Sequence, residues 1–112
     1  MNIKKKNYIE LQQVKAFIAD VPFDVKVEYD LTVEKLEAHG RLTRPFGEKV
    51  DGTLFAIRII QTANIRVFYV YGYSDNIYGI HAYHKKSQKI PLKEKKQAEK
   101  KIKLLKQQGM IR

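Results

Sequence analysis

Residues 53–84, TLFAIRIIQTANIRVFYVYGYSDNIYGIHAYH, decide the fold. Three runs rich in Ile, Val, Tyr and Phe occupy 53–61, 65–73 and 76–84, and short polar connections separate them. Because β-branched and aromatic residues favour strands and short connections favour hairpins, this stretch predicts three antiparallel strands in a meander.

Strand alternation assigns the side chains of these runs to two faces. The apolar residues at alternate positions within 55–59 point to a core, whereas Arg58 points the other way and shares an exposed face with Arg66 on the next strand. Two guanidinium groups side by side would form a site for phosphate oxygens. The alternative is an ion pair at the sheet rim, in which Glu48 or Asp51 is the partner of Arg58 or, less favoured, of Arg66.

The segment after the third run, HAYHKKSQKIP at 81–91, mixes imidazole, phenol and ammonium groups. Lysines neutralise phosphates, imidazoles move protons near neutral pH, and an aromatic ring can stack on a base. Alternation places His81 and His84 on opposite faces of the strand, so at most one of them faces the arginines. The candidates from this segment are His81, Tyr83, His84, Lys85, Lys86 and Lys89.

Positive charge is concentrated at the carboxy-terminal end. Residues 84–112 contain ten lysines and one arginine against two glutamates, a net charge of +9 out of +10 for the whole chain. A field this local attracts nucleic acid, an anionic membrane or an acidic protein, and charge alone does not choose among them. The alternative is a solvated helix face. Lys93, Lys96 and Lys100 are the candidate RNA-binding residues of this tail.

The amino-terminal third reads as two helices. Apolar residues spaced by three and four from Tyr8 to Asp20 predict an amphipathic helix, which Pro22 ends. Good helix formers and Gly40 as a C-cap predict a second helix from Phe23 to His39. The alternation within 25–33 also fits a strand, and that alternative stays open.

The remaining segments complete an α+β fold. Residues 41–52 predict a loop, and Pro91 opens a final basic helix with Gly109 as its C-cap. We therefore expect residues 1–112 to form a single domain: an antiparallel sheet of three or four strands, two amino-terminal helices packed on it and a carboxy-terminal basic helix.

Composition limits the chemistry. The chain has no cysteine, and its three histidines lack ligand-rich neighbours at metal spacing. No metal site and no cofactor are expected. No apolar segment is long enough for a signal sequence or a membrane span, which predicts a soluble, cytoplasmic protein without a membrane partner.

The carboxy-terminal half resembles the HigB-like toxins of type II toxin–antitoxin systems, in the phage-derived branch of the RelE superfamily. The segments that carry the resemblance are Leu54-Phe55-Ala56-Ile57-Arg58, Arg66-Val67-Phe68-Tyr69, His81 with Tyr83, Lys85 to Pro91, and Glu94 with Ala98. The chain departs from that pattern at Phe55 and Ala56, where the family usually has Trp and Glu, and at Ile90, where it usually has a hydroxyl residue.

The resemblance implies a small RelE-like fold and a metal-independent endoribonuclease that cuts mRNA, commonly on the ribosome. It also implies a cognate antitoxin of the helix-turn-helix type, through which DNA would be contacted indirectly. Attack by the RNA 2′-hydroxyl on the adjacent phosphate is the expected reaction. The expected catalytic residues are Arg58, Arg66, His84, Lys85 and Lys86. The rival hypotheses are a noncatalytic basic RNA-binding module and a helix-mediated partner of an acidic protein.

Overall fold

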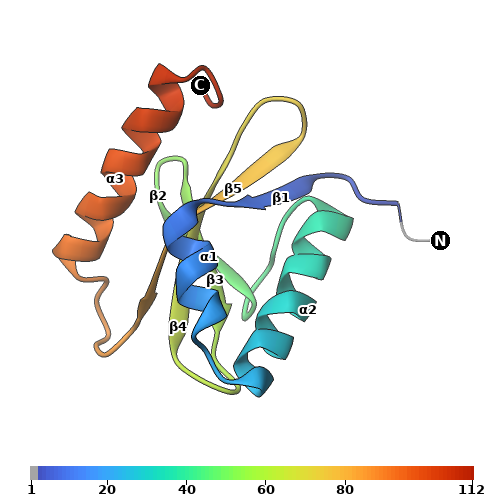
Figure 1. Ribbon diagram of the computed structural model, residues 1–112, viewed down its shortest axis with the longest axis vertical. Helices are drawn as coiled ribbons and strands as arrows, with labels where there is room; N and C mark the ends of the chain where they lie inside the picture. Colours follow the sequence, from blue (N-terminus) through green and yellow to red (C-terminus); the bar gives the residue numbers. More distant parts are fainter. Residues whose placement is uncertain (1–2) are drawn as a thin grey trace.

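A five-stranded mixed sheet forms the centre of the protein (Figure 1). The computed structural model describes residues 3–112. Its elements are, in chain order, β1 (Asn7–Glu10), α1 (Gln12–Ala19), α2 (Phe23–His39), β2 (Gly47–Asp51), β3 (Leu54–Ile59), β4 (Ile65–Tyr71), β5 (Asn76–His84) and α3 (Leu92–Gln107). Across the sheet the order is β1-β5-β4-β3-β2; β1 runs parallel to β5, and the other neighbours are antiparallel.

Helices cover both faces of the sheet (Figure 1). On one face, α1 and α2 bury residues such as Val14 and Leu36 against Ile57 and Val67 of the strands. On the other face, α3 packs Ala98 and Leu105 over a second apolar cluster of the sheet. The α+β class, the two amino-terminal helices on the sheet and the basic last helix are therefore confirmed.

Local signals fix the ends of α2. Pro22 precedes its first residue, and Gly40 ends it in the left-handed conformation with φ of 76°, donating its N–H to the Leu36 carbonyl. A residue with a side chain is strained at that φ, so glycine suits the position. The helix from Phe23 to His39 is confirmed, and the strand alternative for 25–33 is wrong.

The sheet is larger than expected. The prediction of a helix from Tyr8 was wrong because Asn7–Glu10 pairs with Asn76–Gly79 as a parallel edge strand, and α1 begins at Gln12. The prediction of a loop at 41–52 was wrong for Gly47–Asp51, which pairs with β3. An all-antiparallel sheet of three or four strands thus becomes a mixed sheet of five.

The meander itself matches the prediction. β5 covers 76–84 as expected, and β3 and β4 lie within the predicted runs. Pro91 is the residue before α3 rather than its first residue, and Gly109, with φ of 71°, follows the cap residue Gln108. Within residues 3–112, no helix combines the length and apolarity needed to cross a membrane.

One carboxylate ties the β3–β4 connection to α2. Glu28 accepts hydrogen bonds from the backbone N–H groups of Ile60, Gln61 and Thr62 at 2.7–3.1 Å and from the Thr62 hydroxyl at 2.8 Å. Partial burial acts to raise the pKa of Glu28, but these hydrogen bonds together hold it below its ordinary value. The connection between the strands that carry Arg58 and Arg66 is therefore anchored.

Candidate nucleic-acid site beneath the last helix

Three polar side chains form a row across the sheet, on the face that α3 covers. In the strand register Arg58 of β3 is opposite Arg66 of β4, and Arg66 is opposite Tyr83 of β5. Cross-strand partners share a face, so the predicted placement of the two arginines on one face is confirmed. The prediction that this face is exposed was wrong for Arg66, which is only 4% exposed.

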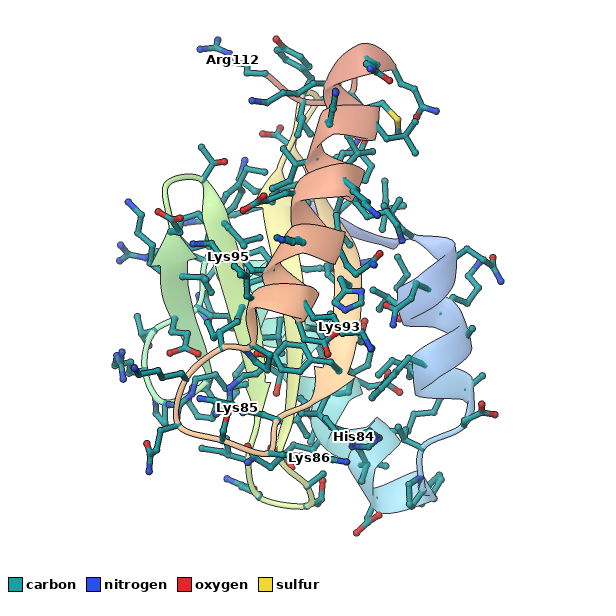
Figure 2. The ribbon with its side chains drawn as sticks, turned by 90° about the vertical axis from the view of Figure 1, so that its left-hand side faces the viewer. His84, Lys85, Lys86, Lys93, Lys95 and Arg112 are labelled. Atoms are coloured by element: carbon teal, nitrogen blue, oxygen red, sulfur yellow. The ribbon has the colours of Figure 1, made fainter. Side chains whose placement is uncertain are left out.

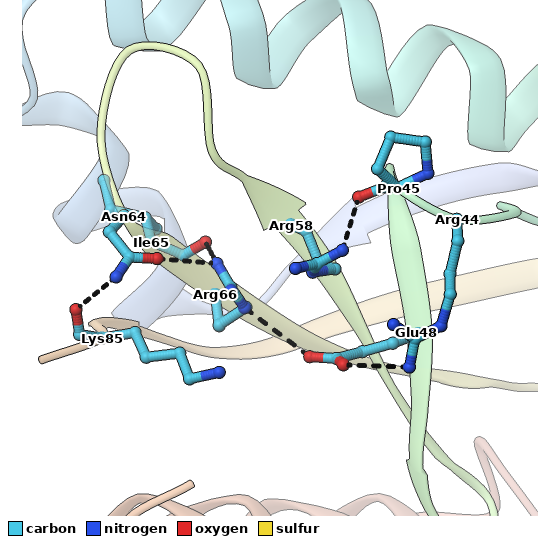
Figure 3. A network of polar contacts seen from close by, with 8 residues as sticks. All are labelled: Arg44, Pro45, Glu48, Arg58, Asn64, Ile65, Arg66 and Lys85. Carbon is cyan, nitrogen blue, oxygen red and sulfur yellow. Dashed lines mark hydrogen bonds and ion pairs between the residues drawn. The ribbon is translucent and has the colours of Figure 1, made fainter. Parts of the chain in front are cut away.

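The arginines differ in their surroundings (Figure 3). Arg58, half-buried at the rim, donates from Nη1 to the Pro45 carbonyl at 3.2 Å. Arg66 lies deeper and donates from Nη1 to Asn64 Oδ1 and to the Ile65 carbonyl, both at 3.1 Å. Arg58 is therefore the guanidinium closer to solvent, with Arg66 behind it.

Glu48 is the carboxylate of this site. Its Oε1 lies 3.6 Å from Arg66 Nε, and its Oε2 lies 3.9 Å from Arg44 Nη2 (Figure 3). Of the two arginines for which an ion pair with Glu48 was considered, Arg66, the less favoured one, forms it. In the β2–β3 register Glu48 is opposite Ala56, so it places a carboxylate beside the position where the resembling family usually has glutamate.

All the buried side-chain nitrogen and oxygen atoms that lack a hydrogen-bond partner among the described residues belong to this one region. They are Glu48 Oε1, Arg58 Nε, Arg66 Nε, His81 Nδ1 and Tyr83 Oη. Leaving a buried donor or acceptor unpaired costs about 1–3 kcal/mol. A cluster of such atoms on neighbouring strands calls for partners, which can be water, an ion or a polar ligand.

Electrostatics set the protonation of two members of the row. Burial lowers the pKa of Arg66, the facing Arg58 lowers it further, and Glu48 opposes the change. A guanidinium nevertheless stays charged at neutral pH. Burial raises the pKa of Tyr83 to about 12, while Arg66 acts in the opposite direction. Tyr83 therefore keeps its proton near neutral pH and can donate it in a hydrogen bond.

The first turns of α3 are fixed over the row by one hydrogen bond and one ion pair. Glu94 Oε1 lies 2.7 Å from His81 Nε2, and Lys95 Nζ lies 2.7 Å from Asp51 Oδ2. His81 is buried, and the ring of Tyr83 packs on Phe68 with centroids 5.4 Å apart. Tyr83 is buried beneath α3, so its ring offers no open face on which a base could stack in this structure. Its hydroxyl, rather than its ring, is the unpaired group.

Several predicted residues lie apart from the row. His84 lies on the opposite face, where its ring is 4.9 Å from that of Phe17, because strand alternation separates it from His81. The separation of the two histidines is thus confirmed, and His84 is not brought to the arginines. In Figure 2, Lys85 and Lys86 lie below the start of α3. Lys85 is half-buried and accepts at its carbonyl from Asn64 Nδ2 at 2.9 Å.

The remaining lysines face solvent. Lys86 and Lys89 lie on the segment before α3, and Lys93, Lys96 and Lys100 lie along the helix, all of them exposed. These side chains are accessible to a polyanion, in contrast to Arg66, His81 and Tyr83.

Sequence reasoning missed the roles of Glu48 and Glu94. The signal for Glu48 was the alternation of β2, which is short and flanked by Pro45 and Gly52 and so resembles a loop. Glu94 could have been found from its position in the first turn of the predicted last helix, just after the basic segment. Across the described part of the chain, no group of three His, Asp or Glu side chains is arranged to hold a metal ion.

Comparison with known proteins assigns the family. The family model described as phage-derived protein Gp49-like matches residues 16–103, which is most of the chain and includes every residue of the row. No curated protein matches the sequence. The chain therefore belongs to the phage-derived Gp49-like family, a family related to toxin–antitoxin systems and RelE-like in kind.

Proposed function

We propose that this protein is the toxin of a toxin–antitoxin system, a HigB-like endoribonuclease that cleaves mRNA on the ribosome without a metal ion or cofactor. The observation that carries the proposal is the row of Arg58, Arg66 and Tyr83. In this row Arg58 Nε and Tyr83 Oη lack an acceptor, and Arg66 Nε has only the Glu48 carboxylate, at 3.6 Å. A phosphate group offers several oxygen acceptors and a negative charge, which is the ligand that such a row fits.

The arginines and the adjacent lysines would stabilise the reacting phosphate. In this mechanism Arg58, at the rim, contacts a phosphate oxygen, and Arg66 adds positive charge from behind it. Lys85 and Lys86 approach from the segment after β5. Negative charge grows on the phosphorane as the 2′-hydroxyl attacks, and positioned cations lower the energy of that state more than that of the bound substrate.

Proton transfers need an acceptor and a donor. We assign the acceptor to Glu48, because His84 lies on the other face of the sheet and His81 Nε2 is engaged by Glu94. Tyr83, protonated at neutral pH, is the donor near the leaving 5′-oxygen. Bond formation from the 2′-oxygen to phosphorus and loss of the 5′-oxygen leave a 2′,3′-cyclic phosphate and a 5′-hydroxyl, so DNA would not be cut.

The partners follow from the family. A toxin–antitoxin-related family implies an antitoxin, and we propose a helix-turn-helix antitoxin that silences the toxin and provides its indirect contact with DNA. The exposed lysines of α3 would bind RNA phosphates, on the ribosome or in the message.

The test is controlled expression in bacteria. We expect growth arrest and shortened mRNA from the parent, with 5′-hydroxyl ends mapped by sequencing and cyclic phosphate on the other fragment. Arg58→Gln should abolish both effects. Arg41→Gln is the matched control, since Arg41 is an exposed arginine outside the row.

Two results would overturn the proposal. Normal growth with full-length transcripts, despite folded parent protein, would exclude the nuclease. Growth arrest with RNA bound but uncut would instead favour the noncatalytic RNA-binding module, for which the basic face of α3 alone would suffice.

A further inference from the structure

Helix α2 is apolar on two sides. Its inner side buries Val25 and Tyr29 against the sheet. Its outer side carries Phe23, Val27 and Leu31, which are 82%, 39% and 55% exposed. These three recur every four residues and so form one stripe along the helix. Exposed apolar residues scattered singly are ordinary, but a continuous stripe of large ones marks an interaction surface.

A groove runs along this stripe. A cavity of about 460 Å³ is lined by Phe23, Val27, Leu31 and Phe46 together with residues of the β3–β4 connection. A second cavity of about 780 Å³ continues it toward the end of α2 and shares Leu31 and Lys35 with the first. Lys35 itself lies over the Phe46 ring, with Nζ 3.6 Å from the centroid. We call these two adjoining cavities, which meet at Leu31 and Lys35, the α2 groove.

The charge around the α2 groove is opposite to that of the rest of the protein. Helix α2 has five acidic residues and two lysines, a net charge of −3 in a chain of net charge +10. Glu34 is exposed, has no ion-pair or hydrogen-bond partner among residues 3–112, and lies one turn beyond Asp30. The basic helix α3 lies on the other side of the sheet (Figure 1).

We propose that the α2 groove binds a helical segment of another protein, with an apolar stripe flanked by lysine or arginine. The apolar stripe would cover Phe23, Val27 and Leu31, and the basic flanks would meet Glu34 and also Asp30, in exchange for its exposed ion pair with Lys26 at 3.3 Å. A polyanion would be repelled from this side. The site therefore accepts a protein partner while the row beneath α3 faces a different ligand, and the proposal holds whether or not the chain cleaves RNA.

A second copy of this chain is a poor occupant. Its basic helix α3 exposes Leu92 and Leu104, but these are three turns apart with lysines between them, so they do not form a matching stripe. Docking α3 of one copy into the groove of the next would also be head-to-tail, a contact that builds rings or open chains rather than the two-fold dimers that are commonest.

The test uses a synthetic peptide and the full-length chain in 150 mM salt. The probe is a sixteen-residue helical peptide with leucines at every fourth position and flanking lysines, labelled for fluorescence anisotropy; a companion peptide has glutamates in place of the lysines. Leu31→Gln should weaken binding of the lysine peptide at least tenfold, and Glu34→Lys should do the same. The matched controls are Leu104→Gln and Glu99→Lys on α3. Each should change the affinity for the lysine peptide less than twofold.

Each alternative gives a distinct result. The proposal is overturned if the lysine peptide does not bind measurably. It is also overturned if Leu104→Gln and Leu31→Gln lose the same affinity for that peptide. Tighter binding of the glutamate peptide to the groove, abolished by Leu31→Gln, contradicts the charge argument. Self-association of the chain by sedimentation, lost in Leu31→Gln, would assign the groove to a second copy. Circular dichroism confirms that each variant remains folded.

Discussion

Arg58 and Arg66 lie directly opposite each other in the pairing of β3 with β4, with the Glu48 carboxylate 3.6 Å from Arg66. Like charges directly opposite each other destabilise a sheet. Glu48 supplies a negative charge on the neighbouring strand. This carboxylate offsets part of the repulsion between the two arginines.

Replacing Glu48 should therefore destabilise the fold. Removing the charged partner of a buried group leaves the other charge uncompensated, and we expect Glu48→Gln to lose about 2 kcal/mol in urea unfolding. Glu99→Gln, an exposed control on α3, should change stability by less than about 0.5 kcal/mol. In an Arg58→Gln background the effect of Glu48→Gln should shrink, because the facing charge is gone. If Glu48→Gln lowers stability by the same amount in the Arg58→Gln background, Glu48 does not offset the repulsion between the arginines.

Removing the Tyr83 hydroxyl should lower the cleavage rate without lowering the stability of the fold. Because this oxygen has no hydrogen-bond partner within the described chain, Tyr83→Phe should leave the free energy of unfolding unchanged or slightly higher. If the hydroxyl contacts RNA, the cleavage rate at saturating substrate should fall at least tenfold. Full activity in a stable Tyr83→Phe protein would remove this residue from the proposed mechanism.

The lysines should divide into two groups. Replacing Lys100, Lys101 and Lys103 by Gln should weaken RNA binding and flatten its salt dependence, because lysines of α3 outside the row act through their charge. Lys100 and Lys103 are exposed and Lys101 is half-buried. Replacing Lys85 and Lys86, on the segment after β5, should lower the rate of single-turnover cleavage even at saturating RNA or ribosome, if they reach the reacting phosphate as proposed. Indistinguishable saturating rates for the two variants would assign all five lysines to binding alone.

Glu28 should make stability depend on pH. Its pKa is lower in the folded protein than the ordinary value of 4.5, so the unfolded chain binds the proton more readily. Its contribution is complete above pH 4.5 and is lost as the pH falls through the folded pKa. Glu28→Gln should cost about 1 kcal/mol at pH 7, and the difference from the parent should narrow below pH 4.5. A constant difference from pH 7 to pH 3 would contradict this role.

The sequence predicted those parts of the fold that have local causes. Helix α2 could be bounded from Pro22 and Gly40, and β5 from its β-branched and aromatic run. Strand β1 could not be predicted, since its four residues resemble a helix start and its pairing partner lies 69 positions away. β2 was missed because its residues are half polar and its pairing depends on β3.

The sequence predicted which residue types form the candidate site but not that some of them are buried. Strand alternation put Arg58 and Arg66 on one face and separated His81 from His84. The burial of Arg66 and Tyr83 depends on α3 folding back over that face, a long-range contact that periodicity does not contain. Glu48 was considered as an ion-pair partner for either arginine, and its pairing with Arg66 rather than with Arg58 depends on the register of β2.

The parallel pairing of β1 with β5 has a consequence for synthesis. Residues 7–10 leave the ribosome long before their pairing partners at 76–79. The first strand therefore has no partner while the middle of the chain is synthesised. The edge of the sheet closes late, after loop entropy over more than half the chain has been overcome. Because β5 also carries Tyr83, the row and the sheet are completed together, and an unfinished chain has neither.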